Sequence, residues 1–338
     1  MLELNLVKES EMQAAVVYEA GAVPVYAEFP EPEPADGKAL VELVGAGVHQ
    51  VVRSRVAGRH YSVAGAWPAV PGVDAVARTP DGRLVYTGFV TPPWGTMAER
   101  MAVPAQFGIE LPAGADPLAV AAGMNPGSAS WLPLSKRHDQ LGERGLATVL
   151  VLGATGMSGS IAADNAYALG ATTVVAVGRN TTKLEGLAAR VGADRGLRTV
   201  GLTGDPGTDT AGIVAALDGQ PPSIVIDFCW GPVAESTFRA LGDPNLDVDD
   251  YDVSYVQIGT TAGPDATVPG ALLRSRNLTL SGSGLGGTPV AEILARLPGF
   301  LAQIAAGTVH IPYTTYPLSR IAEAWSAQDG TRAVVVPS

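Results

Sequence analysis

A glycine-rich turn near the middle of the chain has the residue types and spacing of a phosphate-binding loop. The turn at 153–159 reads Gly-Ala-Thr-Gly-Met-Ser-Gly, and it follows an apolar run at 146–152 that predicts a buried strand. Gly156 would let a pyrophosphate approach the backbone, and Gly159 would let the next helix pack closely on the strand. We therefore expect cofactor contacts from most of the turn, namely Ala154, Thr155, Gly156, Met157, Ser158 and Gly159.

The helix predicted at 159–169 would add to this site, because its free N–H groups and the positive end of its dipole would face the phosphates. Ala154 replaces the first glycine of the usual G-x-G-x-x-G pattern. The alternative is an ordinary tight turn between two packed elements.

Two cations follow the next predicted strand, at the position that selects between dinucleotide cofactors. The strand at 173–177 leads into Gly178, Arg179 and Asn180, and Lys183 follows one helical turn later. Sites for the unphosphorylated cofactor usually carry Asp or Glu about 20 residues beyond the glycines. Here Arg179 can hold a 2′-phosphate in its planar fork, and Lys183 adds a point charge. The pattern predicts that the cofactor is NADP(H). The alternative is that Arg179 and Lys183 are exposed cations at the start of an ordinary helix.

The composition excludes several classes of protein. The 338 residues include 22 Lys and Arg against 33 Asp and Glu, which gives a net charge of −11. The sequence has no cluster of cations of the kind that binding to nucleic acid requires. The chain has one cysteine, so no intramolecular disulfide or four-cysteine zinc site can form. This residue, Cys229, lies in an apolar run and is expected to be a buried thiol. No apolar stretch reaches the roughly 18 residues of a membrane span, and the start lacks a signal-peptide layout. We expect a cytoplasmic enzyme that binds neither nucleic acid nor membranes.

The pattern of elements changes near residue 117. Before it, short strand patterns separated by Pro, Gly and Asp turns predict a β-rich region, in which 28–38 reads as an extended connection. After it, strands alternate with helices of about ten residues, which predicts a parallel, doubly wound sheet. The predicted strands are 146–152, 173–177, 224–228, 253–259 and 277–281, and the predicted helices are 159–169, 181–191 and 232–241. Residues 206–212 and 243–252 read as surface loops, and 311–336 returns to the β-rich pattern.

Several short motifs occur in an order that points to a family. They are Met-Gln-Ala-Ala-Val at 12–16, Pro-Gly-Val-Asp at 71–74, Trp-Gly-Thr-Met-Ala-Glu at 94–99, the glycine turn, Val-Gly-Arg-Asn at 177–180 and Val-Gln-Ile-Gly at 256–259. From Met12 onward the chain resembles the medium-chain dehydrogenases/reductases, of the zinc-independent quinone oxidoreductase type. The resemblance implies an α/β fold: a Rossmann-type doubly wound parallel sheet domain at 124–284, and a β-rich GroES-like catalytic domain at 1–123 and 285–338.

The resemblance bears on whether the chain binds zinc. Zinc-dependent relatives carry a Cys after the strand that here ends near Gly47, and a Gly-His-Glu near position 72. This chain has His49 at the first place and Gly-Val-Asp at 72–74, and valine cannot ligate a metal. We expect no metal. The alternative is that His49, His60 and Asp74 converge to bind one.

The resemblance also implies which residues surround the nicotinamide and the substrate. The nicotinamide would lie in the cleft between the domains, outside the carboxyl ends of the strands. Candidate cofactor contacts there are Phe228, Trp230, Gly259, Thr260, Ser281 and Ser283. Tyr61 lies where related enzymes carry a tyrosine near the substrate, and its hydroxyl, or the imidazole of His49 or His60, could donate a proton. The alternatives are interdomain packing for Tyr61, a satisfied core group for His49 and a surface position for His60.

These observations predict an NADPH-dependent oxidoreductase that transfers a hydride to an enone-type C=C or a quinone without zinc. The alternatives are a zinc-free carbonyl reductase or alcohol dehydrogenase, and a non-catalytic NADPH-binding protein. The apolar strand pattern at 277–280 would lie at the sheet edge, which related enzymes pair across a dimer axis, so we expect a homodimer.

Overall fold

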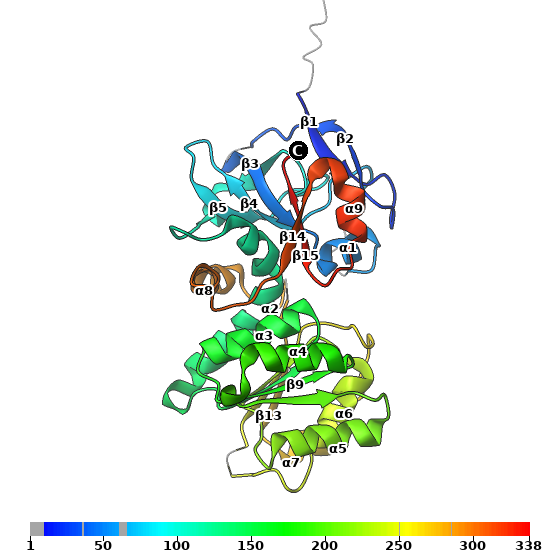
Figure 1. Cartoon of the computed structure of the whole chain (residues 1–338), viewed down its shortest axis with the longest axis vertical. Helices are drawn as coiled ribbons and strands as arrows, with labels where there is room; N and C mark the ends of the chain where they lie inside the picture. Colours follow the sequence, from blue (N-terminus) through cyan, green and yellow to red (C-terminus); the bar gives the residue numbers. More distant parts are fainter. Residues whose placement is uncertain (1–9, 36, 61–65, 250, 285) are drawn as a thin grey trace, which may run out of the picture. The chain divides into compact units, whose positions relative to one another are not determined.

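The computed structural model describes residues 10–35, 37–60, 66–249, 251–284 and 286–338 (Figure 1). Contacts divide these residues into two compact units. The mixed-sheet unit contains the described residues up to Asn125, together with Ile304–Ala306 and Ile311–Ser338. The parallel-sheet unit contains Pro126–Gln303 and Gly307–His310. Within the described ranges, no helix is long and apolar enough to cross a membrane.

The mixed-sheet unit is built from short strands, as its Pro- and Gly-rich sequence predicts. A two-stranded sheet pairs β1 with β2, and a larger sheet has the order β14-β15-β3-β4-β5-β7, with β6 paired to β3. The elements are β1 Glu11–Val16, β2 Val25–Pro30, β3 Lys38–Gly47, α1 Gln50–Val56, β4 Asp74–Arg78, β5 Leu84–Gly88, β6 Arg100–Pro104, β7 Ile109–Glu110, β14 Tyr313–Pro317, α9 Ile321–Ser326 and β15 Arg332–Val336. The C-terminal β15 pairs with β3, which places the end of the chain in the same sheet as strands from its first hundred residues.

The parallel-sheet unit has six parallel strands in the order β10-β9-β8-β11-β12-β13. Its elements are β8 Thr148–Leu152, α3 Met157–Ala168, β9 Thr173–Gly178, α4 Thr181–Val191, β10 Leu197–Gly201, α5 Pro206–Leu217, β11 Ile224–Asp227, α6 Gly231–Leu241, β12 Val253–Gln257, α7 Gly270–Ser275, β13 Leu278–Gly282 and α8 Val290–Ala305. Helix α2, Pro117–Leu141, begins in the other unit and ends in this one. The direction of winding reverses between β8 and β11, and ligands of such sheets bind at this reversal, outside the carboxyl ends of the strands.

Alternate residues of each strand pack against opposite layers of helices, as the pleat of a strand requires. Leu150 and Leu152 of β8 belong to a core shared with α5 and α6, whereas Val149 and Val151 belong to a core shared with α2, α3 and α4. Figure 1 shows α3 and α4 on one face of this sheet and α5 and α6 on the other. The predicted doubly wound α/β fold is confirmed.

Two sequence-based assignments of elements are wrong. Residues 206–212, predicted as a loop, begin helix α5. The Asp205 carboxylate accepts a hydrogen bond from the Thr208 N–H at 2.8 Å, and Pro206 occupies the first turn, where proline is favoured, so the Pro-Gly pair opens a helix here. The extended connection predicted at 28–38 begins inside strand β2, which pairs with β1 along its whole length. Proline is tolerated there because β2 is an edge strand, in a sheet of two strands.

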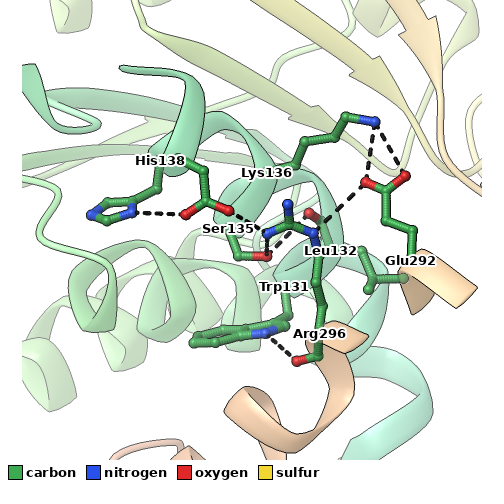
Figure 2. A network of polar contacts seen from close by, with 8 residues as sticks. Trp131, Leu132, Ser135, Lys136, His138, Glu292 and Arg296 are labelled. Atoms are coloured by element: carbon green, nitrogen blue, oxygen red, sulfur yellow. Dashed lines mark hydrogen bonds and ion pairs between the residues drawn. The ribbon is translucent and has the colours of Figure 1, made fainter. Parts of the chain in front are cut away.

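Helix α8 packs within the parallel-sheet unit, whereas we expected residues 285–303 in the β-rich domain. The Trp131 indole N–H of α2 donates to the Arg296 carbonyl of α8 at 3.0 Å, and the rings of Trp131 and Phe300 lie 5.7 Å apart. Figure 2 shows the polar contacts around this pair, in which Arg296 reaches Ser135 of α2 and Glu292 reaches Lys136. The sequence-based boundaries of the domains otherwise stay predictions.

Candidate nucleotide site and its surroundings

The glycine turn links the end of β8 to helix α3, and it is held against the end of β9. Gly153 has a φ of +88°, which few other residues adopt, and the N–H groups of Gly153 and Ala154 both donate to the Val177 carbonyl at 2.9 Å. A β-carbon on Gly159 would lie 2.2 Å from the Gly153 carbonyl oxygen. One on Gly156 would meet only that oxygen, at 3.5 Å, and Gly156 is exposed. The turn is therefore tight on its inner side and open at Gly156, where α3 begins.

The end of β9 contacts the same turn. A β-carbon on Gly178 would lie 2.6 Å from the Thr155 Cγ2 atom, so a larger residue here would require the Thr155 side chain to move. Arg179 and Lys183 follow, both exposed, and within the described ranges neither has an ion-pair partner. The Asn180 side chain caps α4 by accepting a hydrogen bond from the Lys183 N–H at 3.0 Å. Two cations without a carboxylate partner thus lie beside the open glycine turn.

Asp227, which the sequence reasoning did not single out, organises the turn after β11. It is fully buried; its Oδ1 accepts from the N–H groups of Cys229 and Trp230 at 2.7 and 2.9 Å, and its Oδ2 accepts from the Tyr255 hydroxyl at 2.6 Å. Burial raises the pKa of Asp227 above its usual range, although these hydrogen bonds oppose the shift. The contacts fix a turn in which Trp230 has a φ of +56°.

The remaining candidate cofactor contacts lie at the carboxyl ends of β11, β12 and β13. A β-carbon on Gly259 would lie 2.7 Å from the Phe228 carbonyl oxygen, so the turns after β11 and β12 touch through backbone. Thr260 and Ser281 are exposed, and the Ser283 N–H donates to the Gln257 carbonyl at 2.9 Å. The Trp230 ring is directed toward the core, 6.0 Å from Phe238 and 6.3 Å from Tyr255. The structure thus brings these candidates to the sheet edge that carries the glycine turn.

The candidate proton donors of the mixed-sheet unit have different surroundings. His49 is buried, with its Nε2 3.3 Å from Asp74 Oδ1 but without hydrogen-bond geometry. Asp74 Oδ2 accepts a hydrogen bond from the Tyr86 hydroxyl at 2.8 Å, and burial and this carboxylate raise the pKa of Tyr86 well above its usual value. His60 is half-buried, and burial, followed by the Arg55 charge, lowers its pKa, so its imidazole is neutral at pH 7. Tyr61 lies outside the described residues.

In the described part of the chain, no three His, Cys, Asp or Glu side chains are grouped to hold a metal ion. His49 and Asp74, two members of the alternative metal set, do lie together. The third group at that place is the hydroxyl of Tyr86, which is a hydrogen-bond donor to Asp74.

Comparisons with known proteins agree with the observed fold. No family model matches the chain. A probable NADPH-dependent quinone reductase of Emericella nidulans is 30% identical over 357 aligned positions, which cover 93% of this chain and 96% of that protein. A mycobacterial quinone oxidoreductase has a similar structure, with a TM-score of 0.79 and 20% identity over 96% of this chain and all of the other. The quinone oxidoreductase of Thermus thermophilus, also solved with NADPH, has a TM-score of 0.74 and 24% identity over 96% of this chain and all of the other.

Proposed function

Because this chain belongs to the quinone oxidoreductase-like medium-chain dehydrogenases/reductases and is an NADP(H)-dependent oxidoreductase, we propose that it delivers the hydride to a quinone or an enone-type C=C, without zinc. When bound, NADPH supplies the hydride, and the protein's part is to hold the cofactor and orient the acceptor. The balanced reaction consumes one NADPH and one proton and yields NADP⁺ and the hydroquinone or saturated ketone.

The residues at the carboxyl edge of the parallel sheet fit the dinucleotide. The open backbone at Gly156 and the first turn of α3 suit a pyrophosphate, because unpaired N–H groups at a helix start attract phosphate. Arg179 and Lys183 suit the 2′-phosphate, since a guanidinium can bind two phosphate oxygens at once. The pair of cations with no carboxylate partner in the described residues is the observation that carries the cofactor assignment.

A fluorescence titration with NADPH and NADH tests this assignment. We expect the protein to bind NADPH at least tenfold more tightly, about 1.4 kcal/mol, and Arg179→Ala to abolish most of that preference. Arg274→Ala, which removes another exposed arginine of the same unit, is the matched control and should keep it. Equal binding of both cofactors by the unmodified protein would contradict the assignment.

The side chains at the position of the relatives' zinc site support chemistry without zinc. The chain has Val73 between Gly72 and Asp74, its one cysteine is Cys229, and His49 is directed at Asp74. Zinc acts as a Lewis acid on unactivated carbonyl groups. Quinones and enones are already electron-poor, so they accept a hydride more readily.

Product analysis with 1,4-naphthoquinone and 2-cyclohexenone identifies the acceptor class. We expect NADPH oxidation with the quinone, with the alkene of the enone, or with both, and no loss of rate in a zinc chelator. Reduction of the enone carbonyl would instead identify a carbonyl reductase. NADPH binding without turnover on either acceptor would identify a non-catalytic cofactor-binding protein.

The proton donor is tested with the same acceptors. His60 is neutral at pH 7, and His49 is buried against Asp74, so Tyr61 is our proposed donor to the reduced oxygen or carbon. Tyr61→Phe should lower kcat by about tenfold to a hundredfold with little change in the affinity for NADPH. His60→Gln should change kcat less than Tyr61→Phe, and the reverse order would assign the proton to His60.

A further inference from the structure

Two arginine side chains of the mixed-sheet unit lie around the start of α1 without a carboxylate partner among the described residues. Arg53 is on α1, one turn after His49, and its backbone N–H donates to the His49 carbonyl at 3.2 Å. Arg332 is the first residue of β15, and its Nη1 donates to the Val48 carbonyl at 2.8 Å. The Nε of each guanidinium is buried and has no acceptor in the described structure. Each guanidinium therefore has a buried donor that is not satisfied within the described structure.

Several partly buried arginines elsewhere in the molecule are paired with carboxylates. Arg100 lies 2.9 Å from Glu31, Arg137 lies 2.9 Å from Asp252, and Arg190 lies 2.7 Å from Asp164. A buried guanidinium is costly unless an anion or several acceptors compensate its charge. Among the described residues, Arg53 and Arg332 lack such a carboxylate partner, as do Arg55 and Arg276.

The charges around the two arginines do not balance. Burial, followed by the Arg53 charge, lowers the pKa of Arg332 to about 10, and Asp74 opposes the shift. Burial also lowers the pKa of Arg53. The one carboxylate that stabilises Arg332 is already engaged, because Asp74 contacts His49 and accepts the Tyr86 hydroxyl. The carboxylate that stabilises Arg332 thus has other partners, and Arg53 has no ion-pair partner among the described residues.

We propose that Arg53 and Arg332 bind an anionic group of the electron acceptor: a carboxylate, or an ionised hydroxyl next to a quinone carbonyl. Guanidinium groups suit such oxygens, because their planar N–H donors can bind two acceptor atoms at once. The identification of the ligand as the electron acceptor rests on the proposed function. The existence of an anion site at Arg53 and Arg332 does not. A phosphate of the cofactor is the other source of the same chemistry, and the experiment separates the two.

The test compares a charged and a neutral acceptor on the full-length protein. The charged acceptor is 2-hydroxy-1,4-naphthoquinone, whose hydroxyl is ionised at neutral pH, and the neutral one is 1,4-naphthoquinone. In Arg53→Gln and Arg332→Gln we expect the KM for the charged quinone to rise about tenfold or more. The KM for the neutral quinone and the Kd for NADPH should stay within about twofold. Arg59→Gln, which removes an exposed arginine just after α1, is the matched control and should change none of these.

Three results would overturn the proposal. An equal rise in both KM values would make the arginines structural, a weaker Kd for NADPH alone would assign them to the cofactor, and unchanged KM values would leave them without a ligand. Arg53→Gln keeps the contact between Arg332 and Val48, so the test survives if Arg332→Gln lowers the folded yield.

A calorimetric titration separates this inference from the proposed function. If the unmodified protein oxidises NADPH with neither quinone, the proposed function fails, and binding of 2-hydroxy-1,4-naphthoquinone is then measured without cofactor. Binding that weakens in both arginine variants and not in Arg59→Gln would support the anion site. Absent or unaltered binding would overturn it.

Discussion

At the scale of single residues, the Asp227 carboxylate determines how the turn after β11 is built. It accepts the N–H groups of Cys229 and Trp230 and the hydroxyl of Tyr255, which together hold Cys229 in the core beside the glycine turn. A β-carbon on Gly153 would lie 3.1 Å from the Cys229 Sγ atom. The expected buried thiol is therefore present, and a carboxylate lies close to it.

The reactivity of Cys229 should report this environment. Burial, together with the Asp227 charge, raises the pKa of the thiol to about 11. The thiolate is the reactive form, so at pH 8 about one thiol in a thousand is reactive. We expect alkylation by iodoacetamide to be slow and to accelerate close to tenfold per pH unit from about pH 7 to about pH 9.5. In denaturant the thiol should react faster, and its rate should level off once the pH passes the ordinary thiol pKa. A rate that reaches its plateau below about pH 9 in the folded protein would contradict the raised pKa of Cys229.

At the scale of elements, the contacts between α2 and α8 contribute very different amounts to stability. Trp131 of α2 is 6% exposed, packs on Phe300 and donates to the Arg296 carbonyl, so its contacts are dry. Lys136 lies 3.1 Å from Glu292, but its side chain is 52% exposed, and exposed ion pairs contribute little. The attachment of α8 therefore depends on the indole and the aromatic ring more than on the charges seen in Figure 2.

Two substitutions on α2 separate these contributions. Trp131→Ala should lower the free energy of unfolding of the parallel-sheet unit by about 3–5 kcal/mol, because it leaves a cavity and removes the hydrogen bond to Arg296. Lys136→Ala, between one and two helical turns further along α2, should cost less than about 1 kcal/mol. Urea unfolding followed by circular dichroism measures both. Equal losses would mean that the ion pair is worth as much as the buried packing.

At the scale of the whole molecule, strand β13 is an edge of the parallel sheet, and in the described structure it pairs with β12 alone. Four of its five residues are exposed, among them Leu280. An unprotected edge strand offers unpaired backbone groups to another strand. We propose that a second copy of the chain pairs here and forms a homodimer.

Light scattering after size exclusion tests this proposal over a range of concentrations. The unmodified protein should elute as a dimer, and Leu280→Arg should shift it to monomer, because a charge on an edge strand opposes pairing. Leu273→Arg, a matched change of an exposed leucine on α7, should leave the dimer intact. A monomer at all concentrations of the unmodified protein would refute the dimer.

Much of the parallel-sheet unit could be predicted because its signals are local. Apolar runs of Val and Leu marked β8 and β9, and the glycine turn and the Arg179 pattern followed directly from residue order. Local signals also misled at 206–212, where the Pro-Gly pair opens α5 because the side chain of Asp205, the residue just before that pair, caps the helix. Helices α1, α7 and α8 were not predicted; α1 and α7 are only 7 and 6 residues long, too short for a clear helical period.

The sequence by itself determined the α/β class, the glycine turn between strand and helix, the missing carboxylate beside Arg179 and the single cysteine, because each depends on residue type and near spacing. Only the tertiary structure decided which groups distant in the sequence contact one another. Asp74 meets His49 and Tyr86, Asp227 meets Tyr255, and Arg332 reaches the carbonyl of Val48 from nearly the other end of the chain. The physical reason is that burial and charge balance depend on all the groups around a side chain, and the order of residues does not give these surroundings.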